Sequence, residues 1–284
     1  MSYRKERKKR LAIIFVVSTL VILIFTAVFV ALLISDKEEL RNEGIKEYKA
    51  GHYEEAIKLF KESLAENQLF SEKMDLDTRM YLGTAQLKLH QYNEAEKTFI
   101  RVHKDNNGTL DDNKIDTFLG IAQSMKGYGD YMPETIIPDL QQAVAGGNYS
   151  ALIYLASCYY ETGQDEEMIE AYKSAIDHLG MSTYIAYQLS SYYLKNNNPE
   201  TAYYYVEQGL NADDDMFMDK LLYNQVVYYE KSLDYKKAYE LMNDLYKQYP
   251  DDTEYRAEYD YLYTRVNINP NPVHVIEEEE EEEK

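Results

Sequence analysis

A phrase of about twenty residues recurs along this chain, and its recurrence constrains the fold more than any other feature. The first clear copy is GIKEYKAGHYEEAIKLFKESL, residues 44–64. It indicates two short helices joined by a tight turn at Gly51-His52, with small and apolar side chains on one face of the second helix. Such a unit cannot bury its apolar face alone, so several copies must stack against one another.

The copies align on two sets of positions. Near the start of the second helix, successive copies carry Ala56, Ala95, Met168, Ala202 and Ala238, with steps between the last three close to 34 residues. The first helices carry a matching small residue: Gly44, Gly83, Gly120, Ala156 and Ser190. A small residue lets two helix backbones approach closely. We expect a bulky aromatic side chain, Phe60, Phe99 or Tyr172, to fill the space against the next unit.

On these positions the copies at 37–70, 76–109, 149–182, 183–216 and 219–252 resemble tetratricopeptide repeats, and a degenerate sixth copy lies at 113–146. The resemblance implies an all-α fold, an α-α superhelical solenoid in which each helical pair packs only on its neighbours. We expect this solenoid over residues 37–266, with about six helical pairs. A last helix at 251–266 would cap the exposed apolar edge.

An apolar run precedes the repeats. Residues 11–34 contain no charge, proline or glycine. As a helix the run would be about 36 Å long, enough to cross a hydrocarbon core of about 30 Å. It is longer than the core of a signal peptide and no clear cleavage site follows, so it predicts a retained signal-anchor, a single transmembrane helix.

The charges around this run predict its orientation. The basic head, residues 1–10, holds six Lys and Arg, whereas only Lys37 and Arg41 follow closely. The positive-inside bias therefore places the amino terminus in the cytoplasm and the repeats outside it, in a cell membrane that we expect to be bacterial. The inverted orientation, with cytoplasmic repeats, is the alternative.

The chain is acidic, with a net charge of −20 at pH 7. Since binding to phosphates needs a basic stripe, this balance argues against nucleic acid as a partner. Seven consecutive glutamates, Glu277 to Glu283, predict a disordered acidic tail over residues 267–284. The tail is interpreted first as a solvated segment. A lure for a basic partner and a weak site for divalent cations are the sharper alternatives.

No catalytic or metal-binding pattern occurs in the sequence. The five histidines have no nucleophile or metal-ligand spacing around them, and the single cysteine, Cys158, is expected to pack like an alanine inside a helix. Nucleophile elbows, phosphate-binding loops and zinc-protease motifs are also missing. We therefore expect no enzymatic activity, no cofactor, no metal and no small-molecule substrate.

The family resemblance implies a binding surface instead. In tetratricopeptide repeats the first helices line a concave groove that commonly takes a peptide or a partner helix. Tyrosines and lysines suit such a surface, because rigid amphipathic rings and cations anchor peptides. Carrying the inner-face spacing over predicts the following groove residues: Tyr48, Lys49, Ile153, Ser157, Tyr160, Tyr184, Tyr187, Ser191, Lys195, Lys220, Tyr223 and Lys231.

These observations lead to one hypothesis and one alternative. The hypothesis is a membrane-tethered scaffold whose extracytoplasmic groove binds a protein or peptide partner, with a role in envelope assembly or secretion. The alternative is a regulatory subunit of a cell-wall or envelope enzyme complex. Both assign the protein a binding function without catalysis.

Overall fold

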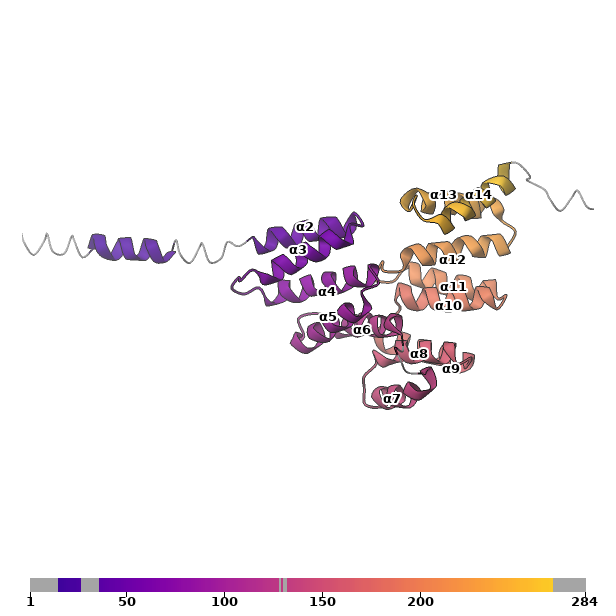
Figure 1. Ribbon diagram of the computed structural model, residues 1–284, viewed down its shortest axis with the longest axis horizontal. Helices are drawn as coiled ribbons and strands as arrows, with labels where there is room; N and C mark the ends of the chain where they lie inside the picture. The colour runs from indigo at the N-terminus through magenta and orange to yellow at the C-terminus, as the bar shows by residue number, and fades with distance from the viewer. Residues whose placement is uncertain (1–14, 27–35, 128, 130–131, 268–284) are drawn as a thin grey trace, which may run out of the picture. The chain divides into compact units, whose positions relative to one another are not determined.

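The computed structural model describes residues 15–26, 36–127, 129 and 132–267 (Figure 1). All the regular secondary structure in these ranges is helical, which confirms the predicted all-α class and the helical repeats. The chain divides into two compact units, with the boundary between Ile115 and Asp116. Each unit is described by itself.

The first unit contains two complete helical pairs, and α6 (Asp112–Lys126) begins before its boundary. Within each pair, and between α3 and α4, consecutive helices pack against each other. The bounds are α2 (Lys37–Lys49), α3 (Tyr53–Ala65), α4 (Glu72–Lys88) and α5 (Tyr92–Asp105).

The second unit continues the same alternation of first and second helices and ends in a single helix. Its consecutive helices from α7 onward pack against one another, except that α9 makes only a small contact with α10. The bounds are α7 (Pro133–Ala145), α8 (Ala151–Glu161), α9 (Asp165–Leu179), α10 (Thr183–Lys195), α11 (Pro199–Leu210), α12 (Met218–Lys231), α13 (Tyr235–Gln248) and α14 (Thr253–Asn267).

Two of the first-helix glycines, Gly44 and Gly83, lie where an aromatic ring of the second helix contacts the backbone, whereas Gly120 lies against Ser150 and Ile153. A Cβ atom on Gly44 would lie 2.7 Å from Cε1 of Phe60, and one on Gly83 would lie 2.5 Å from Cζ of Phe99. Both rings are fully buried. From the sequence, we expected these rings to fill the space against the next helical pair. The structure places them first on the glycine of their own pair, and Phe60 then stacks on Tyr81 of α4, 5.8 Å between ring centroids.

The turns inside the helical pairs share one backbone conformation. The residue five positions before each anchor of the second helix has a positive φ, between 53° and 81°, in the left-handed region. Glycine reaches that region without strain, whereas a side chain with a Cβ does not. The residues concerned are Gly51, His90, Gly163, Asn197 and Leu233.

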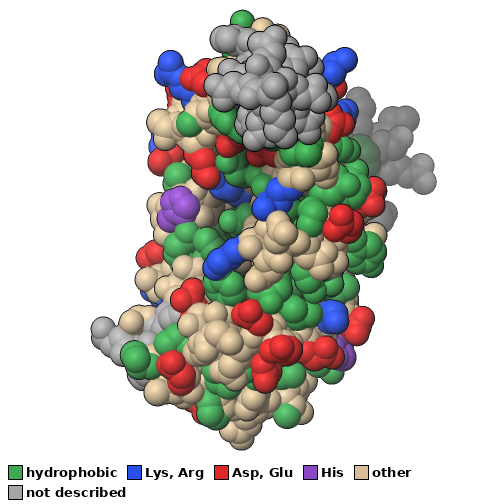
Figure 2. Space-filling model, turned by 90° about the vertical axis from the view of Figure 1, so that its right-hand side faces the viewer, with side chains coloured by type: hydrophobic (Ala, Val, Ile, Leu, Met, Phe, Trp, Pro, Cys, Tyr) green, Lys and Arg blue, Asp and Glu red, His purple; other side chains and the backbone are tan. Residues whose placement is uncertain are grey.

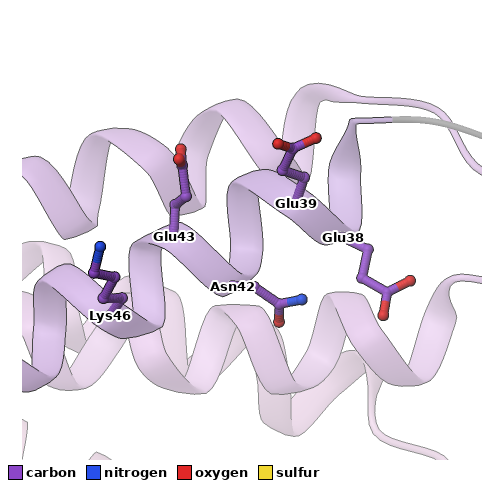
Figure 3. Close-up of a pocket in the computed structure, with 5 residues that line it drawn as sticks. All are labelled: Glu38, Glu39, Asn42, Glu43 and Lys46. Carbon is purple, nitrogen blue, oxygen red and sulfur yellow. The ribbon is translucent and has the colours of Figure 1, made fainter.

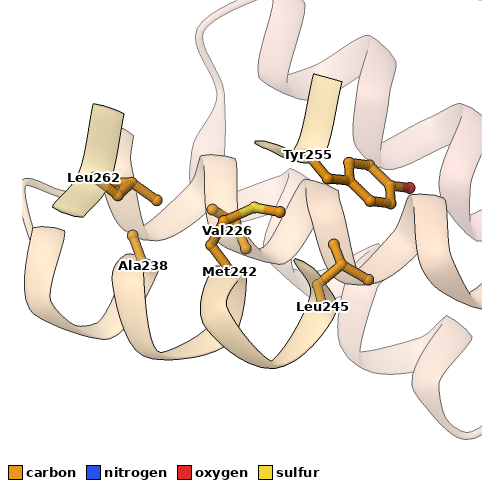
Figure 4. Close-up of a cluster of buried hydrophobic side chains, with 6 residues drawn as sticks. All are labelled: Val226, Ala238, Met242, Leu245, Tyr255 and Leu262. Atoms are coloured by element: carbon orange, nitrogen blue, oxygen red, sulfur yellow. The ribbon is translucent and has the colours of Figure 1, made fainter. Parts of the chain in front are cut away.

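The last helix covers the end of the second unit. Tyr255 and Leu262 of α14 are fully buried against Val226 of α12 and against Ala238, Met242 and Leu245 of α13 (Figure 4). The rest of the predicted acidic tail, residues 268–284, lies outside the described residues.

The predicted transmembrane helix is wrong. Within the run 11–34, the structure describes a helix only over residues 15–26. Among the described residues, the model contains no helix with the length and apolar character that crossing a membrane requires.

This finding contradicts the predicted localisation as a single-pass membrane protein with an extracytoplasmic domain. The basic head, residues 1–10, lies outside the described residues, as do residues 11–14 and 27–34 of the apolar run.

The contact between Gly83 and Phe99 gives a first prediction. In Gly83→Ala the new methyl group meets the Phe99 ring, and overpacking of this kind costs about 1–3 kcal/mol. The gain in helix propensity, about 1 kcal/mol, offsets only part of that cost. We expect a net loss of about 1 kcal/mol in the free energy of unfolding, measured by urea denaturation.

Phe99→Leu provides the matched control. It removes the ring that the methyl group meets, so the double variant should be more stable than the sum of the two single changes predicts. Strict additivity would contradict the proposed contact.

The turn conformation gives a second prediction. Leu233 has φ 61° and is 69 % exposed, so replacing it loses little packing. We expect Leu233→Gly to raise the free energy of unfolding by about 0.5–1 kcal/mol because it relieves left-handed strain. The reciprocal change at the equivalent position, Gly163→Leu, should lower it by at least as much. A loss of stability in both variants would count against the strain.

Candidate functional site

The first helices of the second unit lie side by side and run in the same direction. Contacts between them join residues 35 positions apart: Lys195 Nζ lies 3.1 Å from the Tyr160 hydroxyl oxygen, and the Tyr223 hydroxyl donates to Glu258 Oε2 at 3.4 Å. Other contacts between these helices join residues 33 to 37 positions apart, so equivalent positions of α8, α10, α12 and α14 lie near one another. A side chain repeated in several copies therefore becomes a continuous strip on the surface.

Five accessible residues of these helices form what we call the tyrosine–lysine face: Tyr160, Tyr187, Lys195, Lys220 and Tyr223. Tyr160 is 40 % exposed and Lys195 is exposed, while the other three are half-buried. The Lys195 ammonium lies 5.4 Å from the centroid of the Tyr160 ring, an arrangement in which the ring attracts the cation. The pair joins α8 to α10 at the surface.

Ring stacking and hydrogen bonds fix the tyrosines of this face. Tyr187 stacks on Phe217 with 6.1 Å between centroids, and Tyr223 stacks on Tyr255 at 5.3 Å. The Lys220 ammonium lies over the Tyr255 ring, 4.8 Å from its centroid. Burial, reinforced by Glu258 and Glu254, raises the pKa of Tyr223 well above its ordinary value. The ring therefore offers a partner an edge and a neutral hydroxyl group at physiological pH.

Two predicted groove residues lie in the core instead. Ile153 is fully buried, with its side chain against Gly120. Tyr184 is 2 % exposed, and its hydroxyl lies 2.8 Å from Ser124 Oγ. Neither side chain is exposed to a partner in this structure, because Ile153 lies against Gly120 of α6 and the Tyr184 ring lies edge-on to Phe217, 4.9 Å between centroids.

The remaining predicted residues are divided between the two units. Ser157 and Ser191 are half-buried, and Ser191 Oγ accepts a hydrogen bond from Asn224 Nδ2 at 2.8 Å. Tyr48 belongs to the first unit, half-buried with its ring edge-on to Tyr53 and Tyr81. Two further predicted residues, both exposed, end first helices: Lys49 ends α2, and Lys231 ends α12.

Sequence reasoning missed a hollow of about 450 Å³ beside the capping helix. Burial raises the pKa of Glu230 to about 8, and a hydrogen bond with the neighbouring Glu258 carboxyl group adds to the effect. Arg265 and Lys231 oppose the shift. In the sequence these carboxylates had the spacing of a solvated helix face, so only the packing of α14 on α12 reveals the pair. The hollow is lined by Glu230, Lys231, Tyr235, Glu258 and Tyr261.

Other hollows and charges do not form a comparable site. A second hollow, of about 570 Å³, follows the surface of α2 alone, where Glu38, Glu39, Asn42, Glu43 and Lys46 project from one helix (Figure 3). On the face that Figure 2 shows, Lys and Arg side chains lie among hydrophobic ones, with Asp and Glu interspersed. Among the described residues, no three His, Cys, Asp or Glu side chains converge as metal ligands would.

Comparisons with known proteins agree with the repeat architecture. A family model described as "Tetratricopeptide repeat" matches residues 150–178, which include α8 and most of α9. No curated protein sequence matches the chain.

Several solved structures of repeat proteins are similar to the chain. A repeat protein from Bacteroides fragilis is 15 % identical, covering 81 % of this chain and 99 % of its own, with a TM-score of 0.28. The kinesin light chain-like repeats of Podospora anserina are 15 % identical. The match covers 76 % of this chain and 96 % of theirs, with a TM-score of 0.32. The TPR domain of P58(IPK) is 16 % identical. The match covers 86 % of this chain and 82 % of that domain, with a TM-score of 0.22. Because these TM-scores lie below 0.5, the identification of the helical repeats rests on the family model and on the helical pairs that the structure shows.

The half-buried pair of carboxyl groups, Glu230 and Glu258, gives a third prediction. The folded pKa of Glu230, about 8, lies above its ordinary value of 4.5, so folding holds a proton that the unfolded chain releases. The contribution of Glu230 to the free energy of unfolding is therefore fully present below about pH 4.5 and is lost as the pH rises toward 8. Glu230→Gln has no proton to lose, so we expect its melting temperature to exceed that of the wild type by a few degrees at pH 8.

At pH 4 the two proteins should melt together. The matched control is Glu207→Gln, on the exposed surface of α11, which should leave the difference between pH 4 and pH 8 unchanged. An equal gain for both variants at pH 8 would show a general effect of net charge rather than the carboxyl pair.

Proposed function

We propose that this protein, a member of the tetratricopeptide repeat family, binds a segment of a protein partner on its tyrosine–lysine face. Stacked helical repeats act as interaction scaffolds because each added repeat extends one continuous surface. The observation that carries the proposal is the exposed pair Tyr160 and Lys195, which joins α8 to α10 at the surface.

The composition of the face indicates which chemistry it would bind. Half-buried rings such as Tyr187 and Tyr223 are already fixed by stacking, so they can accept apolar side chains without losing much conformational freedom. Lys195 and Lys220 contact aromatic rings rather than carboxylates in the described part of the chain. A partner segment with apolar and acidic side chains would therefore complement this face.

The partner can be identified with a photo-crosslinking amino acid introduced at a chosen position. Placed at Tyr160, the probe should capture a discrete polypeptide in cells that make the protein. Placed at Tyr204, a tyrosine of the second helix α11 that is more exposed than Tyr160, it should not. A single captured enzyme would support the regulatory-subunit interpretation, whereas equal capture from both positions would contradict a specific face.

The fourth prediction concerns affinity for the purified partner. We expect Tyr160→Ala and Lys195→Ala each to weaken binding about tenfold, because aromatic and cationic anchors each contribute more than 1 kcal/mol. Tyr204→Ala is the control and should bind like the wild type. Isothermal titration calorimetry measures all three. Unchanged affinity for both face variants would show that the partner binds elsewhere.

A further inference from the structure

The loop between α5 and α6 carries the single Asn-Gly pair of the sequence, Asn107-Gly108. Both residues are exposed. Gly108 has a φ of +83°, and a Cβ atom added to it would meet no other atom within 4 Å. Because glycine turns freely and nothing crowds it here, the backbone can bring the Gly108 nitrogen onto the Asn107 side chain.

The preceding residue, Asn106, holds the loop in place. Its Oδ1 atom accepts hydrogen bonds from the backbone N–H groups of Thr109 at 3.1 Å and Leu110 at 2.9 Å, and its Nδ2 atom donates to the Leu110 carbonyl oxygen at 3.0 Å. The Gly108 N–H group, by contrast, donates no hydrogen bond within the described part of the chain. Its nitrogen is therefore open to solvent and available to react.

A hydroxyl group lies on the Asn107 carboxamide. Thr109 Oγ1 donates a hydrogen bond to Asn107 Oδ1 at 2.6 Å. This bond makes the amide carbon a better electrophile, and it stabilises the negative charge that forms on Oδ1 when a nucleophile adds to that carbon. Three successive residues thus supply an electrophile, an accessible nitrogen nucleophile and a hydrogen-bond donor.

We propose that Asn107 is a site of spontaneous deamidation, with the Gly108 nitrogen as the nucleophile and the Thr109 hydroxyl group as the assisting donor. The nitrogen loses its proton to water or hydroxide and bonds to Cγ of Asn107. The bond from Cγ to Nδ2 then breaks, and the amide nitrogen takes a proton from solvent and leaves as ammonia. Water opens the resulting succinimide at either carbonyl group, which gives aspartate or isoaspartate. The net reaction consumes water and releases ammonia.

Asn148 provides a comparison within the same chain. Ser150 Oγ donates to Asn148 Oδ1 at 2.6 Å, so the amide is polarised in the same way. The next residue, however, is Tyr149, whose ring stacks on His178 with 3.7 Å between centroids. A side chain held in this way hinders the backbone movement that would bring its nitrogen onto the amide carbon. The two asparagines therefore differ mainly in the residue that follows.

The products would disturb packing at the end of the first unit. Leu110, in the same loop, packs on a small core of Leu76, Val102 and Ile115. A carboxylate in place of the Asn107 amide would follow the carboxyl end of α5, where the helix dipole disfavours an anion. Isoaspartate also lengthens the main chain by a methylene group, which displaces Leu110 from this core.

The fifth prediction tests the reaction on the full chain. The protein is incubated at pH 8 and digested, and mass spectrometry of the peptides detects conversion of each amide to an acid. We expect Asn107 to convert at least about tenfold faster than Asn148, because a glycine nitrogen reaches the attacking position more easily. A fresh sample digested in parallel corrects for conversion during digestion. An intact Asn107, or equal rates at the two asparagines, would overturn the proposal.

The products identify the nucleophile. Chromatography separates aspartyl from isoaspartyl peptides, and both should appear at residue 107, since a succinimide opens at either carbonyl group. Aspartate alone would show direct attack by water and overturn the role of Gly108.

Two variants of the exposed loop test the other groups. Thr109→Val keeps the shape of the side chain but removes the donor, so we expect conversion of Asn107 to slow about fivefold. Asn107→Gln is the matched control, because it keeps the carboxamide but needs a larger ring, and its mass should stay constant. An unchanged rate in Thr109→Val would overturn the role of the hydroxyl group.

This modification goes beyond the proposed binding function. None of these measurements involves the tyrosine–lysine face, so the two proposals can fail separately.

Discussion

The close approach of two helix backbones, seen inside the pairs of Gly44 and Gly83, is the contact on which the rest of the structure depends. At Gly44 and Gly83 the absence of a side chain lets a fully buried phenylalanine ring lie directly on the first helix. The ring fixes the separation and rotation of the two helices, since protein interiors are packed without spare volume. Each pair therefore presents the next one with the same surface, and the spacing of the stack follows from a local contact.

That constant spacing turns a sequence repeat into a functional surface. Residues 35 positions apart meet across neighbouring first helices, as Tyr160 meets Lys195 and Tyr223 meets Glu258. Side chains that are far apart in the sequence thereby become adjacent without any long loop to bring them together. The tyrosine–lysine face is a strip produced in this way.

The sequence predicted the features that recur and missed those that occur once. The anchors, glycines and helical pairs repeat, so independent copies support each other. Burial at one position depends on the neighbouring helix, which is why Ile153 and Tyr184 were placed in the groove although they are core residues. Lys37, counted only as a charge, is 2 % exposed and donates to the Glu66 carbonyl group. The transmembrane prediction failed for a different reason: hydropathy measures composition alone, and among the described residues no helix has the length and apolar character that crossing a membrane requires.

The tyrosine-rich core has a spectroscopic consequence. The chain contains thirty tyrosines, eight phenylalanines and no tryptophan, so tyrosine dominates its near-ultraviolet absorption and emission. Stacked rings such as Tyr203 with Tyr228 and Tyr246 with Tyr259 lie close enough to exchange excitation energy along the second unit. Because burial raises the pKa of Tyr184 and Tyr255, tyrosinate absorbance in alkali will develop in stages, surface rings first. The protein therefore carries an unlabelled optical probe of its own packing.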